Sequence, residues 1–512
     1  MSNHLFDGLL SQCEPGHIFA HLQDGRRYTY QDVHDVSGRF ANLLLARGLT
    51  PGDRVAVQIP KSIEALMLYL GTIRAGGVFL PLNTGYTATE IRYFVENAEP
   101  TIFVCDPKRQ GEYEPLAREL GFQLETLGVW VPQDMSAGSI TDAGHDFPTA
   151  CETVPRGADD LAAILYTSGT TGRSKGAMLT HENLLSNARD LIECWQFTAE
   201  DVLIHALPIF HTHGLFVATN VTLAAGGSMI FMAGFDSDAV MEALPRATSM
   251  MGVPTFYTRL LDHPRLSKAT TKHMRLFVSG SAPLLAETHI AFEERTGHRI
   301  LERYGMTETN MNTSNPYEGE RLAGTVGFPL PNVSLRIADP ENGAELPQGQ
   351  IGVIEVRGPN VFAGYWRMPE KTAEEFRADG FFITGDLGRI DDEGYVHIVG
   401  RAKDLIISGG YNVYPKEIEL VLDDQPGVQE SAVIGVPHPD FGEGVIGIVV
   451  AKDGARLEEA QLKDAMSGAL AKFKQPKRIY VRDSLPRNAM GKVQKNLLRL
   501  DYADTFKLTV SS

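Results

Sequence analysis

Strand and helix patterns alternate along much of this chain, and this alternation limits the possible fold more than any other feature. Apolar residues recur at helical spacing over 33–44, and the sequence over 54–59 is typical of a buried strand. Two further helices and two short strands are predicted at 62–75, 88–98, 77–82 and 101–106. The rhythm predicts an α/β fold built from layered sheets.

The same rhythm resumes after residue 159 and changes character further on. Buried strands are predicted near Ile164 and Ile204 and over 227–232, 274–278 and 298–301. The scattered Gly, Pro and Asp of residues 107–157 predict a surface excursion. Strand-rich and turn-rich sequence over 324–400 predicts a β-subdomain, and the residues after 401 predict a compact α+β unit.

Composition excludes several classes of function. Lys and Arg number 47 against 64 Asp and Glu, a net charge of −17, which argues against broad nucleic-acid binding and a polybasic membrane anchor. The four cysteines lie far apart without a CxxC pair, which favours a reducing cytoplasm over a disulfide framework. No apolar run approaches the roughly 18 residues of a membrane-spanning helix, and the start resembles neither a signal nor a transit peptide. We therefore expect a cytoplasmic protein.

The densest motif is YTSGTTGRSKG at residues 166–176, which follows an apolar strand. Its glycines allow sharp turns, and its N–H groups, hydroxyls and lysine offer donors and charge to phosphate oxygens. It contains no G-x-x-x-x-G-K match, so it is not a Walker A loop. We predict a phosphate-binding loop that uses Thr167, Ser168, Gly169, Thr170, Thr171, Gly172 and Lys175.

Two other glycine patterns fit their usual functions less well. Residues 172–176 match G-x-S-x-G, but a hydrolase elbow places its serine directly after the strand, and here a polar loop precedes Ser174. The pattern G-x-G-x-x-G occurs at Gly442, Gly444 and Gly447, but a strand pattern follows it where a dinucleotide site requires a helix.

A histidine cluster raises the possibility of a metal site. His205, His211 and His213 lie in LIHALPIFHTHG, with no Asp, Glu or Cys nearby to complete a ligand set. Pocket-lining or core histidines explain them equally well. A serine or metal hydrolase is thus a remote alternative for the whole chain, and a non-catalytic nucleotide-binding regulator is another.

Six motifs, taken together and in order, resemble those of adenylate-forming enzymes, which include acyl-CoA synthetases, peptide-synthetase adenylation domains and luciferases. They are the loop above, LPIFHTHGL at 207–215, YGMTE at 304–308, TGD at 384–386, GRAKDLIISGGYNVYP at 400–415 and PRNAMGKVQK at 486–495. The resemblance implies a large N-terminal domain, here residues 1–402, and a small mobile C-terminal domain, residues 403–512. It also implies a hinge at Lys403.

The resemblance implies a reaction in which a carboxylate attacks the α-phosphate of ATP, pyrophosphate leaves and an acyl-adenylate remains. Lys492 corresponds to the catalytic lysine that bridges the carboxylate and the α-phosphate, and Thr307 contacts that phosphate. Glu308 would hold Mg²⁺, a cation that prefers carboxylate oxygen. The other implied ATP-binding residues lie beside adenine and ribose: Ser281, Ala282, Pro283, Tyr304, Gly305, Met306, Asp386 and Arg401.

The resemblance also implies where coenzyme A binds. Gly409 and Gly410 would line the path of its pantetheine arm, and His211 would lie near the inner end of that path as a catalytic or substrate-binding residue. Acetylation of the catalytic lysine is a known control in related CoA ligases and would neutralise Lys492. A protein acetyltransferase is therefore a candidate partner.

Two arginines bear on the identity of the acid. Arg259 of GVPTFYTRL and Arg303 of LERYGMTETNMN lie in segments that the family places around its acyl pocket. A fatty or aromatic acid favours apolar lining, whereas a second carboxylate explains buried arginines; structural ion pairs would explain them as well. Three stretches resemble the malonate-activating members of the family in particular: SGSAPLLAETH at 279–289, LERYGMTETNMNTSNPYEG at 301–319 and PNVFAGYWRMPEKT at 359–372. We expect ligation of malonate or methylmalonate to CoA, with another short-chain or aryl acid as the alternative.

Overall fold

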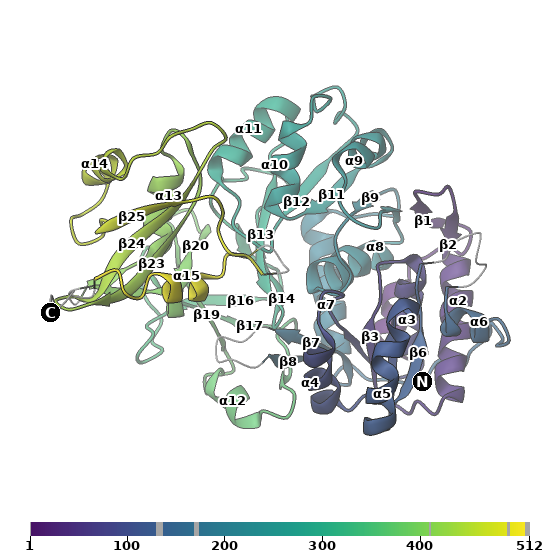
Figure 1. Ribbon diagram of the computed structural model, residues 1–512. Coiled ribbons are helices and arrows are strands. Elements are labelled where there is room, and N and C mark those ends of the chain that lie inside the picture. Colours follow the sequence, from purple (N-terminus) through teal and green to yellow (C-terminus); the bar gives the residue numbers. More distant parts are fainter. Residues whose placement is uncertain (1, 130–136, 168–173, 409–410, 489–491, 507–512) are drawn as a thin grey trace. The chain divides into compact units, whose positions relative to one another are not determined.

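The computed structural model describes residues 2–129, 137–167, 174–408, 411–488 and 492–506 (Figure 1). The chain forms two compact units. The larger unit comprises residues 1–335 and 356–382, and the smaller unit comprises residues 336–355 and 383–512. The domain boundary and hinge at Lys403 remain predictions.

The first sheet of the larger unit has the strand order β18-β8-β7-β4-β3-β5-β6. Its strands are β3 (Arg54–Gln58), β4 (Val78–Pro81), β5 (Ile102–Cys105), β6 (Gln123–Thr126), β7 (Leu161–Thr167), β8 (Lys175–Thr180) and β18 (Gly364–Tyr365). Strands β7, β4, β3, β5 and β6 run parallel, while β8 pairs antiparallel with both β7 and β18. The two strands that flank the predicted phosphate loop, β7 and β8, are therefore neighbours in this sheet.

The second sheet of the larger unit has the order β15-β14-β13-β12-β11-β9-β10-β1-β2. Its strands are β1 (Ile18–Leu22), β2 (Arg27–Thr29), β9 (Val202–His205), β10 (Ser228–Phe231), β11 (Ser249–Gly252), β12 (Leu276–Ser279), β13 (Leu301–Met306), β14 (Asn310–Ser314) and β15 (Phe328–Pro329). Neighbours from β1 to β13 are parallel, so their carboxyl ends meet at one edge, where sheet enzymes place their ligands.

Helices cover these sheets (Figure 1). They are α1 (His4–Leu10), α2 (Tyr30–Ala46), α3 (Ile63–Arg74), α4 (Ala88–Ala98), α5 (Gln110–Leu120), α6 (Ser139–Gly144), α7 (His181–Trp195), α8 (Asn220–Ala224), α9 (Ser237–Ala243), α10 (Pro254–Asp262), α11 (Ala286–Thr296) and α12 (Pro369–Glu374). Short 3₁₀ turns lie at Pro107–Arg109 and Leu244–Arg246, and a π-helix spans His213–Thr219.

Local sequence explains where several helices begin. Capping boxes at Thr29, Thr87 and Thr180 satisfy the first backbone N–H groups of α2, α4 and α7. Helix α3 is buried along its whole length, as its apolar composition requires, and it packs against α2. The helices predicted at 62–75 and 88–98 are confirmed as α3 and α4.

The smaller unit contains most of a sheet with the order β16-β17-β19-β20 and a second sheet in which β22-β21-β24-β23 are joined by β25, which pairs with β24. The strands are β16 (Ser334–Ala338), β17 (Gly352–Arg357), β19 (Phe382–Ile390), β20 (Val396–Arg401), β21 (Ile406–Ser408), β22 (Tyr411–Val413), β23 (Val428–His438), β24 (Gly442–Ala451) and β25 (Arg478–Arg482). The helices are α13 (Pro415–Asp423), α14 (Glu459–Ala469) and α15 (Lys495–Asp501), with a 3₁₀ turn at Ala402–Asp404. The predicted β-subdomain and α+β unit are confirmed, and the three glycines of G-x-G-x-x-G lie in strand β24.

The prediction of a surface excursion over 107–157 is wrong. This segment contains α5, the parallel edge strand β6 and helix α6. The Tyr113 side chain of α5 is fully buried, and its hydroxyl donates to Gln58 Oε1 at 2.6 Å. The helical pattern of α5 is weak in the sequence, because this helix buries only a narrow face, exposes many charged residues to solvent and contains Pro115.

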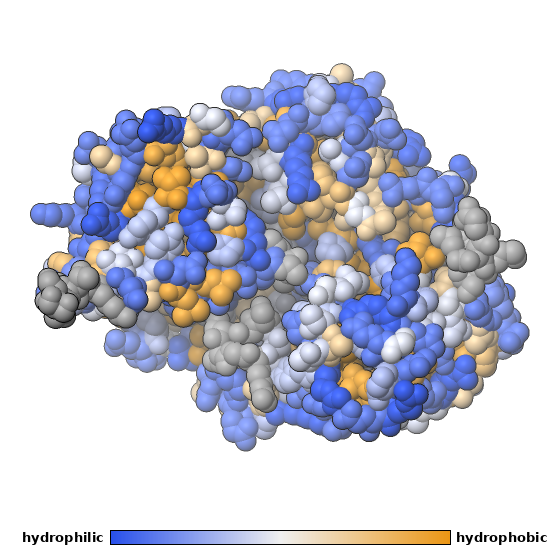
Figure 2. All heavy atoms as spheres, in the orientation of Figure 1, coloured by the Kyte–Doolittle hydropathy of each residue, from blue (hydrophilic) through white to orange (hydrophobic). Residues whose placement is uncertain are grey.

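The molecular surface is mostly hydrophilic on the face shown in Figure 2, as the large excess of acidic residues requires. None of the helices in the described ranges combines the length and the apolar character needed to cross a membrane.

An ion pair between buried Asp201 and half-buried Arg275 joins three segments of the second sheet. Asp201, 3% exposed, accepts bonds of 2.6 Å from both Arg275 Nε and Arg275 Nη2, and a further 2.6 Å bond from Thr248 Oγ1. Burial tends to raise the pKa of the Asp201 carboxyl, but these bonds outweigh it and lower the pKa. Arg275 also donates to the carbonyl of Trp195 at 2.9 Å, which ties the pair to the end of α7.

Replacing Asp201 by Ala is expected to destabilise the larger unit by about 3 kcal/mol, because Arg275 keeps its charge without its partner. Urea denaturation followed by the fluorescence of buried Trp195 measures the change. The Asp201 contribution is present above the usual aspartate pKa of about 4 and is lost as pH falls through the lower folded value. The matched control is Asp238→Ala, which removes a largely exposed carboxylate and is expected to lower the free energy of unfolding much less than Asp201→Ala does. Equal losses in both variants would contradict the structural role of the pair.

Candidate active site

The YGMTE motif occupies the end of β13 and the tight turn into β14. Gly305 faces the carbonyl of Asn310, and a Cβ atom there would lie 1.8 Å from that oxygen, so only glycine fits. Asn310 itself has a positive φ of 49°, and its side chain accepts a 2.7 Å bond from Thr212 Oγ1. The turn therefore fixes Thr307 and Glu308 and connects them to the HTHG segment.

Glu308 belongs to a network of charged and hydroxyl groups at the edge of the first sheet. Its carboxylate is 6% exposed and accepts a 3.1 Å bond from the Tyr365 hydroxyl, which also lies 2.8 Å from Glu375 Oε2. Lys175 Nζ lies 3.0 Å from Glu375 Oε1 and 4.0 Å from the centre of the Tyr365 ring. Lys371 Nζ lies 3.1 Å from the same Glu375 oxygen. The structure thus links the predicted metal ligand to the lysine of the phosphate loop.

The residues around Glu308 suit a nucleotide-bound Mg²⁺. Across the described ranges, no cluster of three or more His, Cys, Asp and Glu side chains is placed to hold a metal ion. Mg²⁺ is commonly held by one or two carboxylates, with phosphate oxygens and water as its other ligands. Glu308 supplies one such carboxylate, and the Thr309 hydroxyl beside it is buried without a hydrogen-bond partner among the described atoms. The Glu308 carboxylate and the oxygens of a triphosphate would together supply ligands of the kind that Mg²⁺ prefers.

The phosphate loop itself is bounded by ordered strands. Thr167 ends β7 opposite Lys175 at the start of β8, and the Ser174 carbonyl accepts a 2.7 Å bond from Tyr93. Ser174 thus leads into a strand, where the hydrolase elbow requires a helix. Five predicted loop residues lie outside the described residues: Ser168, Gly169, Thr170, Thr171 and Gly172.

Arg303 lies at the carboxyl end of the second sheet in an unusual environment. It is 4% exposed, and in the part of the chain that the structure describes its Nε and Nη2 atoms have no hydrogen-bond partner. Its guanidinium packs against Gly280, where a Cβ atom would lie 2.4 Å from Arg303 Cζ. Burial lowers the pKa of Arg303, because no carboxylate compensates its charge. A buried cation with unused donors is chemically suited to bind an anion.

Polar groups surround this arginine. The Nδ1 atom of His213 lies 3.1 Å from Ser281 Oγ, and Ser281 adopts a positive φ of 71° in the loop after β12. Burial and, to a lesser degree, the Arg303 charge lower the pKa of His213, which favours its neutral form. Ala282 and Pro283, the next two residues of this loop, are exposed. The neighbouring Tyr304, Gly305 and Met306 are half-buried.

The sequence places both Arg259 and Arg303 near the acyl pocket, but the two side chains do not line one common cavity. Tyr257 of α10 points into the core, where its hydroxyl donates to the Val278 carbonyl at 2.6 Å. Arg259, two residues on, faces the opposite side of the helix and is exposed. It lines a cavity of about 560 Å³ that Arg303 does not reach.

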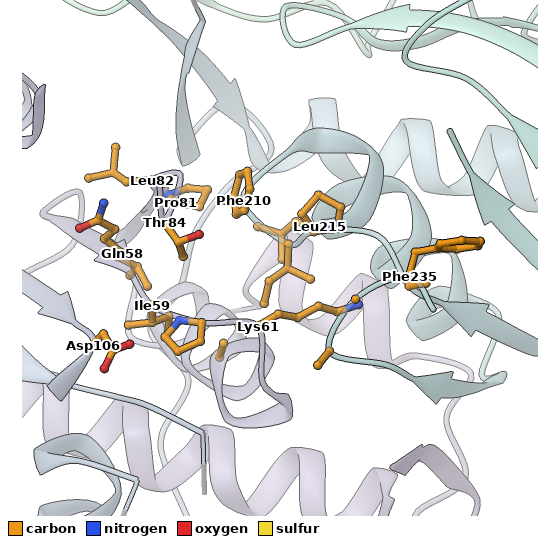
Figure 3. Close-up of a pocket in the computed structure, with 18 of the residues that line it drawn as sticks. Gln58, Ile59, Lys61, Pro81, Leu82, Thr84, Asp106, Phe210, Leu215 and Phe235 are labelled. Atoms are coloured by element: carbon orange, nitrogen blue, oxygen red, sulfur yellow. The ribbon is translucent and has the colours of Figure 1, made fainter. Parts of the chain in front are cut away.

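This cavity has mixed walls (Figure 3). Gln58, Thr84 and Asp106 lie on one side and Phe235 on the other, with the Lys61 side chain extending between them (Figure 3). Other apolar walls come from Phe79, Ile209, Phe210, Leu215 and Phe256, and Arg109 adds a third cation. The wall at Ile209 and Phe210 directly precedes His211, whose ring lies 4.5 Å from that of Phe210.

His205 is a structural histidine. Lys61 Nζ donates to its Nδ1 at 3.0 Å and to its carbonyl at 2.9 Å, so its Nε2 carries the hydrogen and donates to the Gly214 carbonyl at 2.9 Å. Burial, together with the Lys61 charge, lowers the pKa of His205. Both ring nitrogens are occupied by protein groups, which disfavours metal ligation. The bonds hold the π-helix that begins at His213 against β9.

The predicted residues of the smaller unit have defined local environments. Asp386 is 3% exposed and accepts a 2.6 Å bond from Arg401 Nε across the β19–β20 pair. Burial lowers the pKa of Lys403 in the turn after β20. The Lys492 side chain is exposed, and its backbone N–H donates to Asn488 Oδ1 at 3.0 Å. Gly409 and Gly410 lie outside the described residues.

Sequence reasoning missed Tyr365, Glu375 and Lys61. No motif marks them, and the strand that carries Tyr365 is two residues long. The only available signal was the alternation of charge in EKTAEEF at 370–376, which is also typical of an exposed helix end.

Two models of known protein families match this chain. Residues 11–366 match the AMP-binding enzyme family, and residues 417–492 match the AMP-binding enzyme C-terminal domain. The chain is 35% identical to a malonate–CoA ligase of Arabidopsis thaliana over 93% of this chain and 85% of that protein. It is 37% identical to a feruloyl-CoA synthase of an Amycolatopsis species over 94% and 96%.

A solved structure is more similar still. The ATP-bound crystal structure of MatB from Rhodopseudomonas palustris superposes with a TM-score of 0.96 at 61% identity, covering 99% of this chain and 100% of that one. Both the sequence and the fold confirm the predicted resemblance. The chain belongs to the AMP-binding enzyme family.

Proposed function

We propose that this enzyme joins malonate to coenzyme A at the expense of ATP, through a malonyl-adenylate, with release of AMP and pyrophosphate. The similarity to a malonate–CoA ligase supports the substrate class. The single structural observation that carries the proposal is the buried Arg303 guanidinium with unused donors. Methylmalonate, which differs by one methyl group, is a second substrate under this proposal.

Charge decides between malonate and the aryl acids suggested by the similarity to a feruloyl-CoA synthase. An uncompensated buried cation is costly, and an Arg–carboxylate bond contributes about 1.5 to 3 kcal/mol. The distal carboxylate of malonate would pair with Arg303, whereas an aromatic ring would leave its two nitrogens without partners. The absence of a Cβ at Gly280 leaves room for the guanidinium in this position.

The chemistry of the other predicted site residues suggests a role for each of them. We propose that Thr307 and Lys175 contact phosphate oxygens, and that Lys492 stabilises the negative charge that develops during adenylation. Mg²⁺ held by Glu308 would neutralise charge on the phosphates. Tyr304, with Gly305, Met306 and the loop residues Ser281, Ala282 and Pro283, would flank adenine. Asp386, held by Arg401, would accept the ribose hydroxyls.

The cavity lined by Phe235 and Arg259 is proposed to receive the pantetheine arm of coenzyme A. Its apolar walls suit that uncharged chain, and its wall at Ile209 and Phe210 ends at His211, the predicted inner end of the path. Arg259 is exposed at this cavity, so its charge faces the side from which the phosphates of coenzyme A would enter. The hinge at Lys403, acetylation of Lys492 by a protein acetyltransferase and a cytoplasmic location remain part of the proposal.

A pyrophosphate-release assay over a panel of acids, with and without coenzyme A, tests the function. Malonate is expected to give the highest rate, methylmalonate a lower one, and acetate, propionate and ferulate little activity. Ester hydrolysis without ATP, or a preference for ferulate, would contradict the proposal.

The two arginines are expected to affect different steps. Arg303→Met should lower kcat/KM for malonate by about 10- to 150-fold, since a charged hydrogen bond that contributes about 1.5 to 3 kcal/mol is lost. Arg259→Ala should raise KM for coenzyme A and leave malonate-dependent pyrophosphate release near the wild-type rate. In the absence of ligands, Arg303→Met should melt no lower than wild type, because an unpaired buried charge is removed. Loss of malonate selectivity in the Arg259 variant alone would reverse the assignment.

Lys492 is expected to serve the first half-reaction only. Lys492→Ala should reduce malonyl-adenylate formation by at least about 100-fold, as removal of a charge-stabilising donor does in other enzymes. It should still convert chemically supplied malonyl-adenylate and coenzyme A to the thioester. Single-turnover measurements of each half-reaction check this, and an equal loss in both would remove Lys492 from the adenylation step.

A further inference from the structure

We propose that Glu375 is an internal competitor for the ATP phosphates, which occupies Lys175 until nucleotide displaces it, and that Tyr365 couples this exchange to the metal ligand Glu308. The inference rests on the proposed use of ATP and deepens it. It concerns Glu375 and Tyr365, which no motif of the sequence marks.

The backbone fixes the competitor beside the loop lysine. Strand β18 pairs antiparallel with β8, so Tyr365 lies opposite Ala177. Lys175 projects from the same face of β8 as Ala177, two residues earlier, and its ammonium lies over the Tyr365 ring. Helix α12 follows and ends at its C-cap residue Glu375, whose carboxylate reaches Lys175 at 3.0 Å. The ion pair therefore joins the start of β8 to the end of α12.

The pair is well shielded but can be exchanged. The Lys175 side chain is 12% exposed and that of Glu375 is 21% exposed, so the interaction is less screened than a surface salt bridge. Lys175 directly follows the predicted phosphate loop, which is where a triphosphate would require its charge. The Lys175 ammonium has three N–H donors, but a triphosphate bound there would lie beside the negative charge of the Glu375 carboxylate, which is 3.0 Å from the same nitrogen. Under this proposal, nucleotide therefore replaces Glu375 on Lys175.

Glu375 has a second set of donors that make the exchange possible. Lys371 Nζ lies 3.1 Å from it and the Tyr365 hydroxyl 2.8 Å, so Glu375 stays paired when Lys175 leaves. Tyr365 has one hydroxyl hydrogen and two carboxylate neighbours, Glu375 at 2.8 Å and Glu308 at 3.1 Å. It cannot donate fully to both.

This shared hydrogen links the two binding events. A cation at Glu308 removes the need for the Tyr365 hydrogen there, so Tyr365 donates wholly to Glu375 and compensates the loss of Lys175. Nucleotide without metal receives only part of this compensation, because Glu308 still shares the Tyr365 hydrogen. The arrangement therefore predicts that Glu375 weakens the binding of metal-free ATP, and that Tyr365 offsets part of this penalty.

Calorimetric titration of the full-length enzyme with ATP in EDTA, without malonate or coenzyme A, tests the proposal. Glu375→Gln keeps the shape and the hydrogen-bond acceptor but removes the charge, and it is expected to bind metal-free ATP about three- to tenfold more tightly than wild type. Glu374→Gln is the matched control: Glu374 is adjacent, more exposed and bonded to Lys371, and its loss should change the affinity less than about twofold.

Two further variants separate competition from a general structural effect. Tyr365→Phe keeps the ring under Lys175 but leaves Glu375 dependent on lysines, so metal-free ATP should bind more weakly than to wild type, opposite in sign to Glu375→Gln. In a Lys175→Met background, Glu375→Gln should give no gain. If Glu375→Gln does not fold by circular dichroism, Glu375→Asp serves the same comparison, because its carboxylate is withdrawn by one methylene.

The outcomes are distinct. Unchanged or weaker ATP binding by a folded Glu375 variant, with normal binding by wild type, overturns this inference and leaves the proposed function intact. A gain that persists in the Lys175→Met background also overturns it. Absence of ATP binding by the wild type when Mg²⁺ is supplied in place of EDTA overturns both the inference and the proposed function.

Discussion

The burial of charge is the constraint on which the rest of this structure depends. Asp201 is buried, and the half-buried Arg275 compensates its charge, which holds three segments of the second sheet in place. Glu308 is buried with a hydroxyl donor, and the half-buried Glu375 lies beside two lysines. Arg303 is a buried cation that no carboxylate compensates. Because such a cation is costly, its presence at the edge where ligands bind points to an anionic substrate.

Sheet topology brings chemically different residues to common edges. In the second sheet the carboxyl ends of parallel strands place Gly280 and Arg303 close to one another, although β12 and β13 are separated by a helix. In the first sheet, antiparallel pairing of β8 with β7 and β18 brings Lys175 beside residues nearly 200 positions later. The loops after β3, β4 and β9 bound the cavity that we propose for coenzyme A.

Under the two proposals, the enzyme meets one electrostatic problem at two sites. The acid site would keep Arg303 unpaired, so that an anion gains by binding there. At the nucleotide site Glu375 pairs with Lys175, and ATP would displace it. An unpaired lysine beside a predicted phosphate loop would attract many anions, whereas a paired lysine favours ligands that bring their own cation. Charge pairing in the free enzyme would therefore contribute to selectivity for metal-bound nucleotide.

The sequence by itself determined the α/β class, the positions of α3 and α4, the strand nature of Gly442–Ala451 and the family, because periodicity and contiguous motifs are local properties. It also singled out Glu308, Lys175 and Arg303. Tertiary structure alone decided that Arg303 is buried and uncompensated while Arg259 is exposed, since burial depends on which helix face meets the sheet. The same holds for the Lys175–Glu375 and Lys61–His205 contacts, which join residues 200 and 144 positions apart. No local pattern encodes such pairings, because they arise from strand order and crossover geometry.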